Sequence, residues 1–348
     1  MPGMTHARAR PGTAARIAVP CLAAAVPLAA PALAQVEAPE PPMVAPAPPA
    51  APPPGQGNVA SPPPAVQAMP QQPRLTIGGG YVHQFSADAG GTGTMSADRV
   101  YASLNSRSVL SDELALTLAM GYELDMYRWG GVNGLGVANP WGNVNLFAWQ
   151  ARLAIKVAPS WTLGVGGIFG LAGEADADAG DSIYGGGLAS IAWTPDPTLM
   201  AGIGFLGVSQ IENDPIFVPI PVVHWNFAEE WEVSTIRRPP ASPFVGVDVA
   251  WEPAGSNADV AVGLGWQQRR FRLASSSDPT TSEGIGLDQS WAIFASVGYD
   301  VARTFRVDFI AGCTFSESLE LQDSNGGNRR DASVDPNALL GVFGTISF

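Results

Sequence analysis

The feature that most constrains the fold is a long series of apolar–polar alternations that fills the chain beyond Arg74. In the clearest one, residues 113–127, the even positions from Leu114 to Met126 are all apolar or aromatic, and the odd positions carry small, polar or acidic residues. Successive side chains of an extended strand point to opposite faces. The pattern therefore predicts strands with one apolar face and one polar face.

The length of these segments distinguishes a membrane barrel from a soluble sandwich. About 9 to 11 tilted residues cross a bilayer, whereas soluble strands average nearer 5 or 6. After the N-terminal region no run of about 18 apolar residues occurs, which excludes a helical membrane protein. We predict an all-β fold, a transmembrane antiparallel up-and-down β-barrel with strands at 75–86, 98–109, 113–127, 144–157, 161–172, 182–193, 198–211, 220–227, 231–238, 243–252, 258–274, 287–301, 304–318 and 336–348.

This count is about fourteen, an even number as in bacterial single-chain barrels. The region 219–251 is the weakest part of the pattern, because its strands are short and the Arg238-Pro239-Pro240 connection is brief; one misread hairpin there gives twelve strands. Connections alternate between short and long, as expected for periplasmic turns and outer loops. The longer ones are predicted at 87–97, 128–143, 173–181, 212–219, 275–286 and 319–335.

The last strand ends on an aromatic residue, Phe348, and alternates back through Ile346, Gly344, Val342 and Leu340. This ending resembles the C-terminal signature that outer-membrane proteins present to the barrel assembly machinery, which would then be a partner, as would outer-membrane lipid. An open barrel edge in hydrocarbon would leave backbone groups unpaired. We therefore expect the last strand to pair with the strand that begins near Leu75.

The N-terminal region has the composition of an export signal followed by a spacer. Residues 1–34 combine three Arg, an Ala-rich apolar run and a small-residue cleavage site, which predicts a signal peptide. Residues 35–74 are dominated by Pro and Ala and predict a disordered periplasmic tether, with a cell-wall or periplasmic partner as one use. Without residues 1–34 the chain keeps 15 basic and 31 acidic residues, a formal charge of −16, which argues against nucleic acid. The barrel itself is predicted over 75–348.

Residues that could support catalysis are few. Only His83 and His224 follow the signal peptide, and neither precedes a Ser by two positions as in outer-membrane phospholipases. The acidic loop from Glu174 to Asp181 lacks the spacing of an EF-hand, so a solvated outer loop is favoured. Cys313 has no partner after signal cleavage. We predict no catalytic, cofactor or metal site.

Charged residues on the polar faces are the better functional lead. Charge on the lipid face costs about 2 to 4 kcal/mol for a midplane Arg or Lys, so these side chains should face the lumen. They either line a water-filled pore or pair across a narrow lumen and close it. The pore-lining candidates are Arg107, Glu123, Asp125, Arg152, Lys156, His224, Asp248, Arg269, Arg306 and Asp308.

Nine tryptophans fall mainly near predicted strand ends, where indole rings favour the headgroup level. They are candidates for aromatic girdles, with packing in a soluble core as the alternative. The set comprises Trp141, Trp149, Trp161, Trp193, Trp225, Trp231, Trp251, Trp266 and Trp291.

The segment from Ile216 to Val233 has a Pro-containing lead-in followed by a Trp, polar turn, Trp hairpin. It resembles a motif of an uncharacterised, porin-like outer-membrane barrel family. The resemblance implies a barrel over residues 75–348 and carries no substrate or catalytic residue. The favoured function is a porin-like channel for small solutes in the outer membrane. A closed structural or surface-interaction barrel ranks second, ahead of a hydrophobic-ligand transporter or an enzyme.

Overall fold

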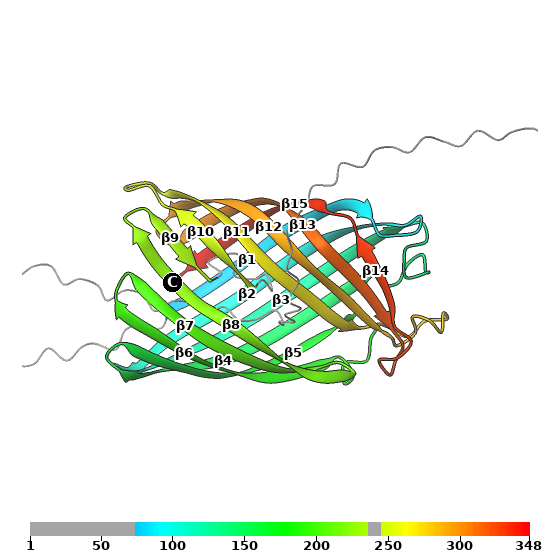
Figure 1. Cartoon of the computed structure of the whole chain (residues 1–348), viewed down its shortest axis with the longest axis horizontal. Coiled ribbons are helices and arrows are strands. Elements are labelled where there is room, and N and C mark those ends of the chain that lie inside the picture. Colours follow the sequence, from blue (N-terminus) through cyan, green and yellow to red (C-terminus); the bar gives the residue numbers. More distant parts are fainter. Residues whose placement is uncertain (1–73, 236–244) are drawn as a thin grey trace, which may run out of the picture.

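Strands follow one another along the chain, and almost every strand pairs in antiparallel register with the next. The computed structural model describes residues 74–235 and 245–348 (Figure 1). The strands in them are β1 (Arg74–Asp88), β2 (Thr94–Ser111), β3 (Leu114–Gly130), β4 (Asn143–Ala158), β5 (Trp161–Glu174), β6 (Ile183–Asp196), β7 (Leu199–Gln210), β8 (Asn213–Ala228), β9 (Trp231–Ser234), β10 (Val245–Trp251), β11 (Ala258–Arg272), β12 (Ile285–Ala302), β13 (Phe305–Gln322), β14 (Arg330–Val334) and β15 (Asn337–Ser347).

The segments β14 and β15 are two halves of one barrel strand. Both pair with β13, and they are separated only by Asp335 and Pro336. Because proline has no backbone donor, it interrupts the hydrogen-bond ladder at this point. The barrel therefore has the predicted fourteen strands, and the twelve-strand alternative is wrong.

The barrel closes between its first and last strands, as expected. β1 pairs with β15 from Thr76↔Ser347 to Gln84↔Leu339. Phe348 N donates to Leu75 O at 2.8 Å beyond the last pair. This closed antiparallel sheet confirms the fold that the resemblance to an outer-membrane barrel family implies. No helix in the described part of the chain is long and apolar enough to cross a membrane.

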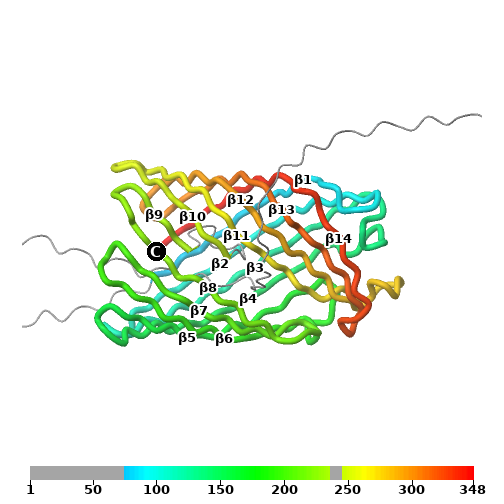
Figure 2. The backbone as a smooth tube through the Cα atoms, viewed as in Figure 1, coloured from blue at the N-terminus to red at the C-terminus, as the bar shows by residue number. Residues whose placement is uncertain are grey.

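The two ends of the barrel differ in their connections (Figure 2). At the short-turn end, on the left with the C-terminus, β2–β3, β4–β5, β6–β7, β8–β9 and β12–β13 are joined by two residues each. At the long-loop end, loops such as 131–142 and 273–284 join the strands. Two predicted loops are wrong. Residues 213–219 belong to β8, and a two-residue turn, 211–212, joins it to β7. The loop predicted at 319–335 is reduced to 323–329, because β13 extends to Gln322 and residues 330–334 form β14.

Several predictions fall where the structure gives no description. The signal peptide, 1–34, and nearly all of the predicted tether, 35–74, lie outside the described residues, although Arg74 is the first residue of β1. The Arg238-Pro239-Pro240 connection between β9 and β10 also lies outside them.

The outward faces of the strands form an apolar belt. Residues that point outward are large and exposed, and their neighbours in sequence are buried, as β12 illustrates with the alternation from Trp291 to Tyr299. A contiguous apolar surface of this extent needs an apolar environment. Exposed members from six different strands include Ile77, Leu104, Phe169, Ile203, Val262 and Phe309.

An aromatic girdle surrounds part of the short-turn end. Trp161 pairs with Trp193 across β5 and β6, and Trp231 pairs with Trp251 across β9 and β10. All four are about 40% exposed, as is Trp225. Trp141 and Trp266 do not belong to this girdle, because both are buried inside the barrel and are at most 8% exposed. For these two, packing in a core is the correct alternative.

The girdle is anchored to the neighbouring turn by one carboxylate. Glu230, between β8 and β9, accepts hydrogen bonds from the backbone N of Ala254 at 2.9 Å and from Trp251 Nε1 at 3.0 Å. These two hydrogen bonds lower the pKa of Glu230 below its ordinary value, and the bond from the Ala254 backbone has the larger effect. The interaction ties two short turns together beside the indole rings.

Candidate functional site in the barrel interior

A layer of buried charges crosses the middle of the barrel. Arg269 on β11 places Nε 2.7 Å from Glu123 Oε1 and 2.9 Å from Asp125 Oδ2, both on β3. Arg99 on β2 lies 3.4 Å from Asp125 and 3.3 Å from Asp288 on β12. Because β3 and β11 are not neighbours in the sheet, these ion pairs form only through the interior. We call these five residues, with Gln84, Tyr127 and Glu317, the polar layer.

The layer continues along the wall toward the closing seam. Gln84 on β1 accepts from Arg99 Nη1 at 2.5 Å and donates to Glu317 Oε2 on β13 at 2.7 Å. Tyr127 donates its hydroxyl to Asp288 at 2.7 Å. Every member of the polar layer is at most 6% exposed. Two guanidinium groups thus face four carboxyl groups in a region that is shielded from solvent.

Strand β11 bends inward beyond the polar layer and reaches the opposite wall. Arg272, its last residue, pairs in parallel with Gly173 of β5, although five strands lie between β11 and β5 along the sheet. A Cβ on Gly173 would lie 2.8 Å from Ser182 Oγ and 3.3 Å from the Arg272 carbonyl oxygen. The backbones therefore approach closely because residue 173 is glycine.

The inward bend of β11 divides the long-loop half of the interior into two compartments. The first is bounded by β11 to β14 and by β1 to β5, and it is filled by an apolar cluster that includes Tyr127, Trp141, Phe271 and Leu319. The second lies between β11 and the wall formed by β5 to β8. It is filled by Ile168, Leu206, Val208, Val218, Ile220 and Trp266.

At Trp266 the outward face of β11 passes from an exposed to a buried environment. Val260, Val262 and Leu264 point outward from the barrel and are exposed, and Trp266 continues the same row. β10 begins at Val245, opposite Trp266. From this residue onward, side chains of β7 and β8 cover the face of β11 that was exterior, so the indole ring is buried.

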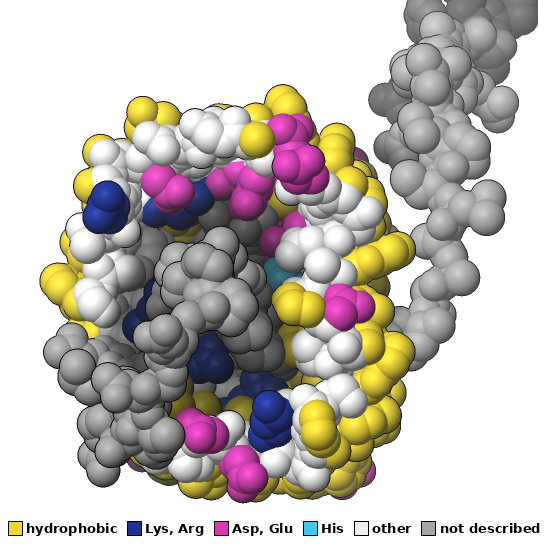
Figure 3. Space-filling model, turned by 90° about the vertical axis from the view of Figure 1, so that its left-hand side faces the viewer, with side chains coloured by type: hydrophobic (Ala, Val, Ile, Leu, Met, Phe, Trp, Pro, Cys, Tyr) yellow, Lys and Arg dark blue, Asp and Glu magenta, His cyan; other side chains and the backbone are white. Residues whose placement is uncertain are grey.

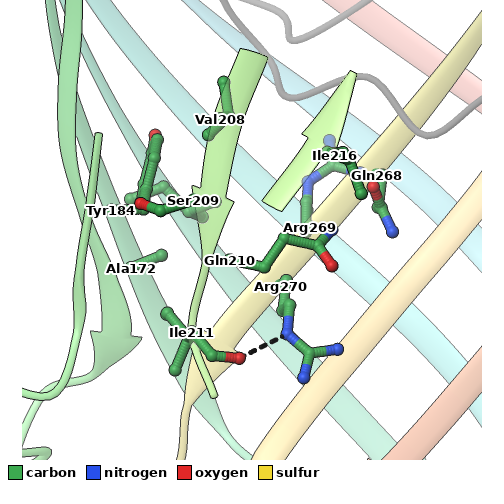
Figure 4. A pocket seen from close by; sticks show the side chains of 11 residues that line it. Ala172, Tyr184, Val208, Ser209, Gln210, Ile211, Ile216, Gln268, Arg269 and Arg270 are labelled. Atoms are coloured by element: carbon green, nitrogen blue, oxygen red, sulfur yellow. Dashed lines mark hydrogen bonds between the residues drawn. The ribbon is translucent and has the colours of Figure 1, made fainter. Parts of the chain in front are cut away.

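A pocket lies between β11 and the β7–β8 hairpin (Figure 4). It is a half-open recess with an empty volume of about 480 Å³, part of which is open to solvent, and it is lined by Tyr184, Val208, Ile211 and Ile216 together with backbone and polar groups of residues 268–270. Arg270 Nε donates to the carbonyl oxygen of Ile211 at 2.8 Å at one edge of this pocket. The lining is largely apolar with a few polar groups, the usual composition of a small-molecule site.

Two side chains hold β11 in its inward position at the long-loop end. Glu174, the last residue of β5, accepts from the backbone N of Gly142 at 2.7 Å and from that of Ala274 at 2.8 Å, linking β5 to two loops. Arg272 Nη2 lies 2.6 Å from Glu212 Oε1, and Arg272 also donates to backbone carbonyls of Glu283 and Ser324. We call Glu174 and Arg272 the latch.

The short-turn end is open by comparison. Figure 3 looks into this end and shows a hollow with Lys and Arg side chains on its inner wall and Asp and Glu side chains nearer the rim. On one side, Arg306 pairs with Asp259, with Asp308 at 2.9 Å and with Asp300 at 3.1 Å. The described residues thus leave the interior hollow toward the short turns and packed toward the long loops.

The structure gathers the predicted charged residues into separate groups. Glu123, Asp125 and Arg269 belong to the polar layer, and Arg306 and Asp308 lie together near the short turns. His224 Nδ1 is 3.0 Å from Glu232, and Asp248 accepts from Ser234 at 2.7 Å. Arg107, Arg152 and Lys156 occupy inward positions on β2 and β4. Their role as pore-lining residues, like that of Phe348 in assembly, stays a prediction.

Sequence reasoning missed three of the six charged residues of the polar layer. Arg99 and Asp288 have the same parity as predicted inward residues of their strands, so alternation could have found them. Glu317 has the opposite parity, because a bulge at Ser316 and Glu317 sets two residues of β13 against one of β12. Ser316 has a positive φ of 51° there, and Leu319 and Leu321 turn inward with Glu317.

His83 does not face the interior. It shares the outward row of β1 with Tyr81 and Phe85, near the long-loop end. Its Nδ1 lies 2.7 Å from Asp98, which also accepts from Tyr81 and pairs with Arg128 at 2.6 Å. These four groups thus meet one another's hydrogen-bonding and charge requirements at the edge of the apolar belt.

Solved structures with a similar arrangement have low sequence identity to this chain, and they include outer-membrane channels. No protein-family model matches the chain, and no curated protein matches it by sequence. An outer-membrane channel from Pseudomonas putida F1 is 10% identical, with 79% of this chain and 95% of that one covered and a TM-score of 0.45. A FadL homologue from Pseudomonas aeruginosa is 11% identical, with 79% and 89% covered and a TM-score of 0.41. The toluene transporter TodX from Pseudomonas putida is 9% identical, with 80% and 89% covered and a TM-score of 0.36. What this barrel does must therefore follow from its own residues.

Proposed function

We propose that this protein is an outer-membrane channel for small solutes that the inward-bent β11 holds closed in the described conformation. The observation that carries the proposal is the polar layer, in which Arg269 meets Glu123 and Asp125 across the interior. Its position in the outer membrane is supported by the apolar belt and by the girdle at the short-turn end.

Buried charges are a poor way to stabilise a plug. The desolvation penalty of an ion pair is often as large as its Coulomb energy, so apolar side chains of similar volume stabilise a core as well or better. This barrel nevertheless keeps two Arg and four carboxyl groups in the layer between the hollow and the packed half. Such groups become favourable when water reaches them, as in a conducting state. A permanently closed structural barrel would have no use for them.

Besides the apolar packing and the polar layer, few contacts fix the end of β11 to β5, so we expect this end to be the part that releases. At the long-loop end, β11 meets β5 through one backbone pair, Arg272↔Gly173, and through the latch residues Glu174 and Arg272. Opening requires β11 to move away from β5 while its pairing with β12 stays intact. We therefore expect conductance to be rare in the native protein and to rise when the latch is removed.

The latch can be tested with the double variant Glu174→Ala, Arg272→Ala in planar bilayers. Each residue makes charge-assisted hydrogen bonds, which contribute about 1.5 to 3 kcal/mol apiece, so their loss should raise the open probability at least roughly tenfold. Single-channel recording of the refolded protein measures this directly.

Arg329→Ala is the matched control, because Arg329 also lies at the long-loop end and its ion pairs, with Glu320 and Asp331, join it to β13 and β14 and not to β11. It should leave the open probability unchanged. If neither the native protein nor the latch variant gives conductance steps above the lipid background, the channel is excluded, and a closed structural barrel becomes the better explanation.

The pocket between β11 and the β7–β8 hairpin favours a second candidate, transport of an apolar ligand. A photoreactive aryl azide of toluene size should label peptides that contain Val208 and Ile216. Ile216→Trp, which fills the pocket, should reduce this labelling several-fold, whereas Ile203→Trp on the outward face of β7 should not. Labelling confined to the outward faces, or equal in both variants, would remove this candidate.

A further inference from the structure

The inner wall of β2 to β5 carries cations without the acids that accompany them elsewhere in the barrel. Between the polar layer and the short turns, the inward positions of β2 (103–109), β3 (115–121), β4 (150–156) and β5 (162–168) hold Arg107, Arg152 and Lys156 and no Asp or Glu. The chain as a whole has 31 acidic and 18 basic residues. A wall of one sign is therefore unexpected in this protein.

Arg107 and Arg152 belong to one row of the sheet. Thr117 of β3 stands between them, pairing with Arg107 on one side and with Arg152 on the other. Strands lie about 4.8 Å apart, which places the two Cα atoms roughly 10 Å from each other. Two guanidinium groups on side chains of this length can both reach a small ligand held over Thr117.

Arg152 differs from the other interior arginines in its partners. Arg99, Arg269 and Arg306 each pair with at least two carboxylates. Among the described residues, Arg152 donates only to Ser190 Oγ, at 3.3 Å, and its buried Nε has no partner. One half-buried guanidinium thus keeps donors available.

The position of the Arg152 guanidinium depends on a glycine. A Cβ on Gly164 of β5 would lie 2.8 Å from Arg152 Nη2 and 2.4 Å from Ser190 Oγ. Glycine at this position lets the guanidinium lie against the wall, between β4 and β6. The side chain is therefore held in place and is not free to seek a distant carboxylate.

We propose that Arg107 and Arg152 form a binding site for a small oxyanion, a phosphate- or carboxylate-bearing solute that enters the hollow from the short-turn end. The planar fork of an Arg matches two oxygens of such an anion, and fixed like charges in a walled hollow raise its local concentration. Lys156 lies four residues beyond Arg152 on the same strand and adds attraction at the mouth. This inference rests on the proposed channel function and defines the class of solute that the channel carries. Equilibrium binding needs only the hollow, so it can be measured whether or not the barrel conducts.

The test is a titration of the refolded full-length barrel, in a neutral detergent at low ionic strength, with inorganic phosphate. Arg107→Gln and Arg152→Gln should each weaken binding roughly tenfold, as expected for the loss of a charge-assisted hydrogen-bond pair, and the double variant should abolish it. Neither substitution strands a carboxylate, so both variants should still fold and show heat-modifiable migration. Arg152→Lys keeps the charge and should recover part of the affinity.

Arg329→Gln removes the same charge at the opposite end of the barrel and should not change phosphate affinity. The proposal is overturned if the folded native protein binds no phosphate, or if the double variant binds it as the Arg329→Gln control does. Failure of this titration leaves the latch experiment unaffected, because conductance through the opened barrel does not require a bound anion. Conversely, phosphate binding without conductance would retain the anion site and remove the channel.

Discussion

Replacement of Arg269 by Met should destabilise the barrel by about 3 to 5 kcal/mol, the cost of leaving buried charges without their partner. Arg269 is 1% exposed, and its Nε approaches both Glu123 and Asp125. Methionine fills much of the volume but leaves Glu123 with no guanidinium beside it. Asp125 keeps Arg99, at 3.4 Å. The stranded carboxylate, rather than the lost packing, dominates the effect.

Urea unfolding of the refolded protein in lipid vesicles measures this cost as a change in the free energy of unfolding. Glu123→Gln, introduced with Arg269→Met, removes the stranded charge and should recover more than half of the loss. Arg329→Met changes the same residue type at a side chain that is 61% exposed, and should cost less than about 1 kcal/mol. An Arg269→Met protein within 1 kcal/mol of the native one would show that the polar layer is already hydrated in the closed barrel.

Replacement of Ile293 by Arg should destabilise the membrane-inserted barrel by about 2 to 4 kcal/mol, because the charge would face hydrocarbon near the bilayer midplane. Ile293 lies near the middle of β12, points outward and is 49% exposed. Its neighbours across the strand pairs are Leu264 and Cys313, so no carboxylate lies beside it on the adjoining strands. The result depends on the barrel spanning a bilayer and on this face meeting lipid.

Val301→Arg is the matched control for Ile293→Arg. Val301 is on the same outward face of β12 and is 55% exposed, but it lies at the short-turn end, where the cost of Arg falls to about 0 to 1 kcal/mol. The difference between the two variants, measured by the same vesicle unfolding, reports depth in the membrane. Equal costs at both positions would contradict the assignment of this face to lipid.

Local alternation was sufficient to predict most of the barrel. The row from Leu114 to Met126 lies on β3 as expected, and the closing pair of β1 with β15 follows from the need to remove a sheet edge. The prediction was wrong where local signals mislead. Residues 212–219, which include Pro215 and Pro219, are predicted as a loop, yet β8 runs through both prolines. On the N-terminal side of Val222, β8 pairs only with β7 among the described residues. A proline in this part lacks a backbone donor, but the loss has little cost because no described strand pairs with the other edge of β8 there.

The candidate site could be predicted only as a set of inward charges. Parity placed Glu123, Asp125 and Arg269 on inward faces, but residues on β3 and β11 meet only because the barrel wall is curved and β11 bends. Parity failed for Glu317 because the bulge in β13 shifts the register by one residue. The residues next to Arg152 in the chain do not show that the inward faces of the strands around it lack acidic residues, because those strands are other segments of the sequence.

The sequence by itself determined that this chain forms about fourteen long two-faced strands and, where the strands are regular, which side chains point inward, because these properties depend on the period of two along an extended backbone. Only the tertiary structure decided which inward charges neutralise one another and which remain available, and that β11 closes the long-loop half of the interior. These outcomes depend on distances between strands far apart in the chain, which barrel curvature, one bulge and one close approach at Gly173 set.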